Sequence, residues 1–96
     1  MDITLKQLQI FQAVVVAGSI TKASRRVGLS QPSISQQLAK LEEKLGAQLI
    51  QRNRTGLVSL TPSGEYWFKV AEDMLRRLDQ AVSEHDRRYV DNAVIL

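Results

Sequence analysis

Apolar positions recur at helical spacing along the first third of the chain. Across residues 5–17 they repeat every three or four positions, which predicts a helix with a broad buried face. Gly18 is suited to end this helix, and Ser19 is placed to cap a second, shorter one with apolar positions at Ile20, Ala23 and Val27. The pattern therefore predicts two helices joined by a tight turn.

A third helical pattern covers residues 30–45, where Ser30 is a suitable N-cap and Pro32 falls in the first turn. One face is an apolar stripe made of Ile34, Leu38, Leu41 and Leu45. The other face carries Ser33, Gln36, Gln37 and Lys40. Hydroxyls and amides at the start of a helix build no core, so this polar face suggests a binding surface.

Two short extended segments follow, at residues 49–51 and 57–60. The residues between them are turn-forming and place Arg52 and Arg54 at the tip of a small β-hairpin. Thr61 and Pro62 then form a cap and a first helical position, and a long helix is predicted from there to about Arg88.

The long helix has more apolar positions than one buried face needs. One stripe has alternating spacings of four and three, and a second repeats every seven residues. One face can pack on the body of the domain while the other pairs with a second copy of the helix. The predicted dimer interface consists of Trp67, Phe68, Ala71, Met74, Leu75, Leu78 and Val82.

The order of these elements predicts a mainly α fold, a winged helix-turn-helix with three helices and a two-stranded wing, followed by a long C-terminal dimerisation helix. The expected division is a winged domain at residues 1–60, a linker helix at 61–88 and a tail at 89–96. The tail ends in the apolar run Ala93–Leu96, and we expect it to lead toward a further domain.

The composition argues against an enzyme or a metal site. The 96 residues include no cysteine, and His85 is the only histidine. No nucleophile stands beside a base, and no glycine-rich phosphate loop is present. No cofactor is expected. Since no apolar run is long enough to cross a membrane, we expect a soluble, cytoplasmic chain without membrane contact.

The positive charge is concentrated in the first part of the chain. Residues 1–60 carry eight basic side chains against three acidic ones, whereas residues 61–96 carry five against seven. This asymmetry suggests that the first part faces a polyanion. In a helix-turn-helix the second helix enters the DNA major groove with its N-terminal residues at the base edges, where Gln and Ser can form hydrogen bonds.

Several short motifs resemble those of a known family. They are Leu8 to Phe11, Ala17-Gly18-Ser19, Lys22-Ala23, the run Leu29 to Ser35, Leu41-Glu42, Leu45-Gly46, Arg52, Leu60-Thr61 and Gly64. Over roughly residues 3–88 the chain resembles the DNA-binding domain of LysR-type bacterial transcriptional regulators. The resemblance implies a homodimer through antiparallel linker helices, a dyad-symmetric DNA target, a wing at the neighbouring minor groove or backbone, and a small-molecule effector bound by a domain absent from this chain.

Base contacts are expected on the resemblance from Gln31, Pro32, Ser33, Ser35 and Gln36. DNA backbone contacts are expected from Thr21, Lys22, Gln37, Lys40, Arg52 and Arg54. Because Gln36 stands where the family often has Arg, guanine, adenine and phosphate all remain open as its target. For Arg25 and Arg26 a solvated basic face is nearly as good an explanation as phosphate contact. The alternative function is a winged-helix module for protein association, whose binding would depend only weakly on salt.

Overall fold

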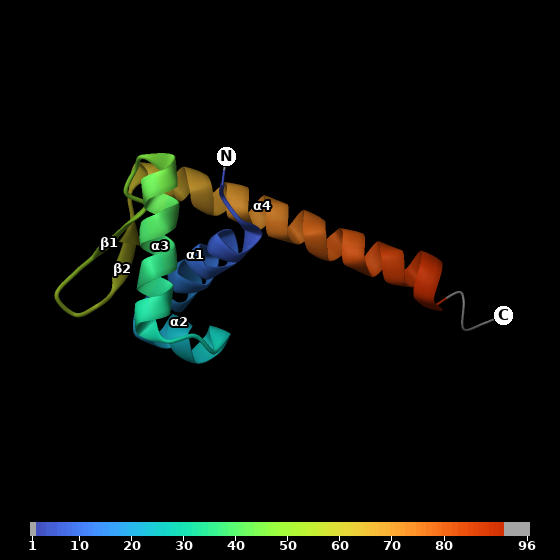
Figure 1. Cartoon of the computed structure of the whole chain (residues 1–96), viewed down its shortest axis with the longest axis horizontal. Helices are drawn as coiled ribbons and strands as arrows, with labels where there is room; N and C mark the ends of the chain where they lie inside the picture. Colours follow the sequence, from blue (N-terminus) through green and yellow to red (C-terminus); the bar gives the residue numbers. More distant parts are fainter. Residues whose placement is uncertain (1, 92–96) are drawn as a thin grey trace.

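The structure, a computed structural model, describes residues 2–91. Its elements are α1 (Leu5–Ala17), α2 (Ile20–Val27), α3 (Gln31–Leu45), β1 (Ile50–Arg52), β2 (Val58–Leu60), α4 (Pro62–His85) and a π-helical turn, η1 (Asp86–Asp91). The first three helices and the hairpin gather at one end, and α4 leaves them as a long arm (Figure 1). The predicted winged helix-turn-helix with a long C-terminal helix is confirmed.

Hydroxyl side chains begin each of the helices α1 to α4. The predicted caps are confirmed, since Ser19, Ser30 and Thr61 each accept a hydrogen bond from a backbone N–H three residues further on. A fourth cap was not predicted. Thr4 and Gln7 bond each other's backbone N–H groups in a capping box, which explains why the amide of Gln7 is buried at only 4% exposure.

The core forms where α1 is covered by the other elements. Phe11 and Val14 of α1 are fully buried, and the ring of Phe11 meets Phe68 of α4 edge-on at 6.4 Å between centroids. The predicted apolar stripe of α3 supplies Ile34, Leu38 and Leu41 to the same cluster. This packing leaves the opposite face of α3 toward solvent.

The hairpin is present, with bounds one residue later than predicted at three of its four strand ends. β1 and β2 pair antiparallel, with Ile50 opposite Leu60 and Arg52 opposite Val58. Arg52 is therefore the last residue of a strand, and only Arg54 of the two arginines lies in the turn, which corrects the placement of both at the tip. The cause is Asn53, whose side chain binds the turn's own amides and so fixes where the turn begins.

The long helix extends well beyond the packed domain. The described chain measures 58 × 28 × 19 Å because the second half of α4 projects from it (Figure 1). Regular α-helix ends at His85 instead of near Arg88, and residues 86–91 continue as η1. The last five residues of the predicted tail, 92–96, lie outside the described part of the chain.

Candidate nucleic-acid interface

The turn between α2 and α3 is fixed by a side chain as well as by a glycine. Gly28 takes a left-handed conformation with a φ of 71°, which allows the chain to turn out of α2. The Ser24 hydroxyl then donates to the carbonyl of Leu29 at 2.6 Å. This bond ties α2 to the residues just before α3, so the first turn of α3 has a defined position.

The predicted base-contact residues divide into two groups by exposure. Gln31, Pro32 and Gln36 are exposed, whereas Ser33 and Ser35 are half-buried. Ser33 also serves the helix cap: its N–H donates to the Ser30 hydroxyl at 3.2 Å, and the two hydroxyls are 2.9 Å apart. Within residues 2–91, the side-chain amides of Gln31 and Gln36 have no hydrogen-bond partner. They are the groups of this face best able to bind a ligand.

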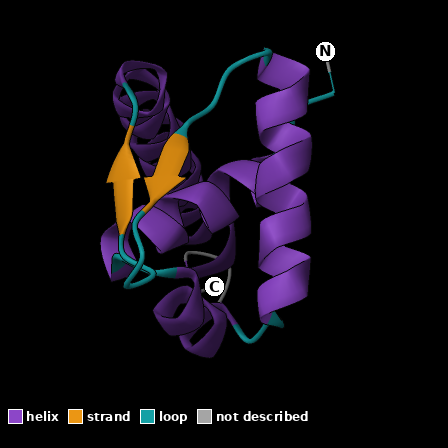
Figure 2. Ribbon diagram, turned by 90° about the vertical axis from the view of Figure 1, so that its left-hand side faces the viewer, coloured by secondary structure: helices purple, strands orange, loops and turns teal. Residues whose placement is uncertain are grey.

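The predicted backbone-contact residues surround that face. Those on α2, on the outer side of α3 and on the wing (residues 50–60) are exposed, namely Thr21, Lys22, Lys40, Arg52 and Arg54; Gln37 is half-buried. The start of α3, α2 and the tip of the wing lie at the same end of the molecule, opposite the start of α4 (Figures 1 and 2). Elements far apart in sequence, on which these residues lie, are thus brought to the same end of the molecule.

The wing tip is organised by one amide. Asn53 Oδ1 accepts hydrogen bonds from the Thr55 N–H at 2.9 Å, the Thr55 hydroxyl at 2.6 Å and the Leu57 N–H at 3.0 Å. The next residue of the wing pairs with the α1–α2 turn, where the Val58 N–H donates to the Gly18 carbonyl at 2.9 Å. The wing is therefore attached to the α1–α2 turn as well as through its covalent connections to α3 and α4.

Cations on this surface have no acidic partner within the described chain. The ion pairs found among residues 2–91 lie on α4 and at its junction with η1, as Arg76–Asp73, His85–Asp86 and Arg88–Glu84. Lys22, Arg52 and Arg54 take no part in them. A polyanion can pair with these side chains without breaking an existing contact.

Two further kinds of site are absent from residues 2–91. None of the clusters of His, Cys, Asp and Glu among residues 2–91 is suited to hold a metal ion. No helix in this part of the chain has the length and apolar character needed to cross a membrane.

The seven residues predicted for a dimer interface have different surroundings. Ala71 and Leu75 are buried in this chain, and Trp67 and Phe68 pack partly against its core. These four residues therefore have little exposed surface with which to contact a second copy. Met74, Leu78 and Val82 remain exposed, at 47%, 40% and 54%.

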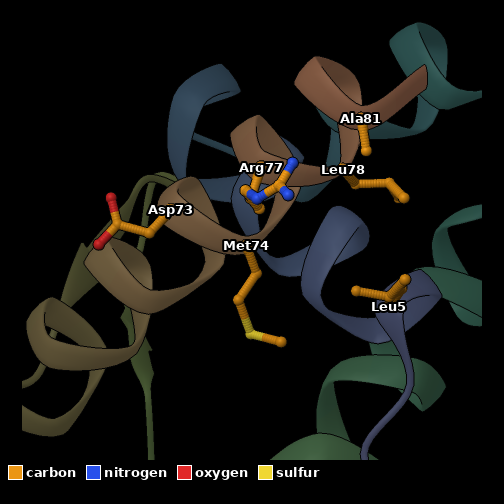
Figure 3. A pocket seen from close by; sticks show the side chains of 6 residues that line it. All are labelled: Leu5, Asp73, Met74, Arg77, Leu78 and Ala81. Atoms are coloured by element: carbon orange, nitrogen blue, oxygen red, sulfur yellow. The ribbon is translucent and has the colours of Figure 1, made fainter. Parts of the chain in front are cut away.

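The exposed part of α4 borders a groove that the sequence did not indicate. This α1–α4 groove of about 500 Å³ is lined by Leu5, Asp73, Met74, Arg77, Leu78 and Ala81. Leu5 of α1 lies opposite Met74 and Leu78 of α4, whereas Asp73 points away from them (Figure 3). Leu5 was missed because its role depends on where α1 begins relative to α4.

Comparison with known proteins identifies the family. Residues 5–65 match the sequence profile described as "Bacterial regulatory helix-turn-helix protein, lysR family". The chain belongs to the LysR family. One LysR relative, the HTH-type transcriptional regulator BenM of Acinetobacter baylyi, is 40% identical over 79 residues, which cover 82% of this chain and 26% of that protein. A probable RuBisCO transcriptional regulator of Cyanidioschyzon merolae is 44% identical over 72 residues, covering 75% of this chain and 23% of that protein.

Solved structures of LysR proteins share the fold. The BenM DNA-binding domain in complex with catB site 1 DNA matches with a TM-score of 0.83 and 39% identity, covering 88% of this chain and 93% of that one. The CbnR DNA-binding domain in complex with DNA matches with a TM-score of 0.81 and 29% identity, covering 88% and 97%. The chain spans about a quarter of the length of the curated relatives it matches.

Two residues of the quoted family motifs have structural contacts that the sequence did not reveal. Glu42 accepts hydrogen bonds from the backbone at the start of the wing, at Leu49 and Ile50. Gly64 packs so closely against Leu49 that a Cβ placed on it would stand 1.9 Å from the Leu49 carbonyl oxygen. A glycine inside a helix was the one signal available for the second contact.

Proposed function

We propose that this chain binds double-stranded DNA sequence-specifically, with α3 in the major groove and the wing at the adjacent minor groove or backbone. The observation that carries the proposal is the pair of exposed, unpartnered amides of Gln31 and Gln36 in the first turns of α3. DNA-bound domains of LysR proteins with the same fold support this function over a protein-association module.

The chemistry of the exposed groups separates residues suited to base contacts from residues suited to phosphate contacts. A glutamine amide presents a donor and an acceptor together, which suits the N6 and N7 atoms of adenine. The exposed cations Lys22, Lys40 and Arg54 carry no sequence information and would hold the domain on the phosphates. The hydroxyl of Ser33 already accepts a hydrogen bond from Ser30, the N-cap of α3. Ser33 would therefore contribute less than the two glutamines.

Self-association through α4 is the second part of the proposal. The α1–α4 groove and the exposed Val82 form an apolar surface on a helix that already projects from the domain. The proposed occupant is α4 of a second copy, running antiparallel. Two copies would present two α3 helices to a dyad whose half-sites lie ~34 Å or a multiple apart. In a longer regulator, a small-molecule effector would act through a region outside this chain.

The DNA proposal is tested by equilibrium titration of a duplex selected from random sequences and of an unselected duplex. Between ~50 and ~200 mM salt, six phosphate contacts predict a loss of affinity of about 10³. Replacing Gln31 and Gln36 with Ala should reduce the preference for the selected duplex more than the affinity for the unselected one. Gln80→Ala, at an exposed glutamine of α4, is the matched control and should change neither. Binding that is absent at ~50 mM salt would refute the proposal and favour a protein partner.

Self-association is tested by sedimentation of the wild-type chain and two variants of the same helix. Leu78→Asp places a charge in the α1–α4 groove and should raise the dimer dissociation constant by at least about tenfold. Gln80→Asp adds the same charge outside this groove and should leave dimerisation unchanged. A monomeric wild type at ~100 µM, or equal effects of the two variants, would contradict the proposed interface.

A further inference from the structure

Glu42 of α3 makes the contact that joins the recognition helix to the wing. One carboxylate oxygen, Oε2, accepts hydrogen bonds from the N–H groups of Leu49 at 2.7 Å and Ile50 at 3.4 Å. These two amides stand immediately before and at the start of β1 (Ile50–Arg52). Hydrogen bonds to a charged acceptor are roughly twice as strong as neutral ones. A single side chain therefore attaches the first strand of the wing to α3.

Leu49 is also the point where α4 meets the same strand. Its carbonyl accepts a hydrogen bond from the Thr61 N–H at 3.0 Å, and the Thr61 hydroxyl donates to the carbonyl of Gln48. The Leu49 side chain is fully buried. The peptide groups of Leu49 are thus held from α3 on one side and from the start of α4 on the other. Together with the bond from the Val58 N–H to the Gly18 carbonyl, this double attachment fixes the direction in which the hairpin leaves the body.

We infer that Glu42 is a positioning residue that sets where the wing arginines stand relative to α3, an inference that rests on the proposed DNA binding. Each wing strand has three residues, so a rotation at the base displaces Arg54 at the tip. The base-reading amides are at the other end of α3, in its first two turns, and do not depend on this contact. Glu42 should therefore affect the contacts of the wing and leave base preference unchanged.

Glu43 provides a matched control within the same helix. It carries the same charge on the adjacent residue, it is exposed, and its carboxylate has no hydrogen-bond or ion-pair partner in residues 2–91. If the two acids acted through charge alone, removing either would strengthen the attraction to phosphate or leave it unchanged. A positioning role predicts the opposite sign for Glu42→Gln.

The experiment measures duplex affinity for the wild type, Glu42→Gln and Glu43→Gln, each with the native wing and with Arg52→Ala/Arg54→Ala. With the native wing, Glu42→Gln should weaken binding about fivefold, whereas Glu43→Gln should not weaken it. Without the wing arginines the effect of Glu42→Gln should disappear, because there is no wing contact left to misplace. Equal affinities of the two glutamine variants, or an undiminished effect in the arginine-free background, would overturn the inference.

Amide hydrogen exchange without DNA separates this inference from the proposed function. In Glu42→Gln the amides of Leu49 and Ile50 should exchange about tenfold faster, with the core amides of Val14 and Leu41 unchanged. Faster exchange in the core as well would show a general loss of stability and would contradict a positioning role. If the wild type fails to bind any duplex, DNA binding is refuted, and unchanged exchange at Leu49 would refute the attachment of the wing independently.

Discussion

The two halves of α4 carry the same apolar pattern but have different surroundings. In the first part of α4, up to Leu75, Ala71 is fully buried and Leu75 is 8% exposed, because both pack against the rest of the chain. In the second half, Leu78 and Val82 continue the pattern with 40% and 54% exposure. The spacing of apolar residues defines the face of a helix that avoids water. It does not tell whether the same chain or another molecule covers that face.

Geometry explains why the change occurs part-way along the helix. α4 has 24 residues and is therefore about 36 Å long, which exceeds the 28 and 19 Å of the two shorter dimensions of the molecule. The winged domain can cover one end of α4 only. The remaining apolar residues must be covered by another molecule or stay in water, which makes the second half of α4 the place to look for a partner.

The largest effect should come from placing the same charge in the two halves. Ala71→Glu buries a carboxylate without a partner and should reduce the free energy of unfolding by about 4 kcal/mol, enough to unfold much of a small domain. Ala81→Glu, ten residues further along, enters an exposed position and should change the stability of the monomer by less than about 0.5 kcal/mol. Urea denaturation at a dilute, monomeric concentration measures both.

In the second half of α4, the added charge should affect self-association instead of monomer stability. At high concentration Ala81→Glu should weaken the dimer, because Ala81 lines the α1–α4 groove. A loss of several kcal/mol in the dilute Ala81→Glu monomer would show that the second half of α4 is part of the chain's own core. That result would remove the distinction between the two halves.

A second, smaller effect should appear at the start of α4, where the helix is fixed to the wing. Gly64→Ala places a methyl group 1.9 Å from the Leu49 carbonyl oxygen, so backbone must move, at a cost of about 3 kcal/mol. In an open helix the same change would instead stabilise by up to about 1 kcal/mol.

Thermal unfolding checks this expectation. Gly64→Ala should lower the Tm by more than about 10 °C for a domain of this size. Ser63→Ala changes the neighbouring residue of the same helical turn and should leave the Tm within a few degrees. A Gly64→Ala chain as stable as the wild type would mean that the contact between α4 and Leu49 is not close in solution.

Features determined by neighbouring residues could be predicted from the sequence. The starts of α2, α3 and α4 depend on hydroxyl caps, and the buried face of α3 on its apolar spacing, and these were placed correctly. The hairpin was predicted, but its strand bounds were displaced because the side chain of Asn53 decides where the turn begins. Local chemistry was sufficient to predict these elements. The exception is the hairpin turn, whose position is set by the hydrogen bonds of the Asn53 side chain.

Features that depend on packing could not be predicted. The polar surface of α3 was recognised, yet the role of Ser33 in its own cap lowers its value as a base contact. Glu42 stood out in the sequence only as part of the Leu41-Glu42 motif, because its contact with Leu49 spans seven residues and a change of direction. Ala71 lies in the core cluster whereas Ala81 is exposed, and this difference in packing is not represented in the sequence periodicity.

The smallest effect should come from the exposed ion pair near the middle of α4. Arg76 and Asp73 are 3.2 Å apart, but their side chains are 61% and 72% exposed, so water and salt screen the attraction. A double-mutant cycle of Arg76→Ala and Asp73→Ala should give a coupling of about 0.5 kcal/mol or less at ~50 mM salt, vanishing at ~1 M. Arg76 with Asp79 has the same spacing along the helix without an ion pair, and its cycle should give no measurable coupling. A coupling above about 1 kcal/mol for the first pair would mean that α4 is more ordered and less hydrated at the start of its second half than the exposure of these side chains indicates. The second half of α4 would then be stabilised within the monomer, and a partner helix would no longer be needed to explain its apolar face.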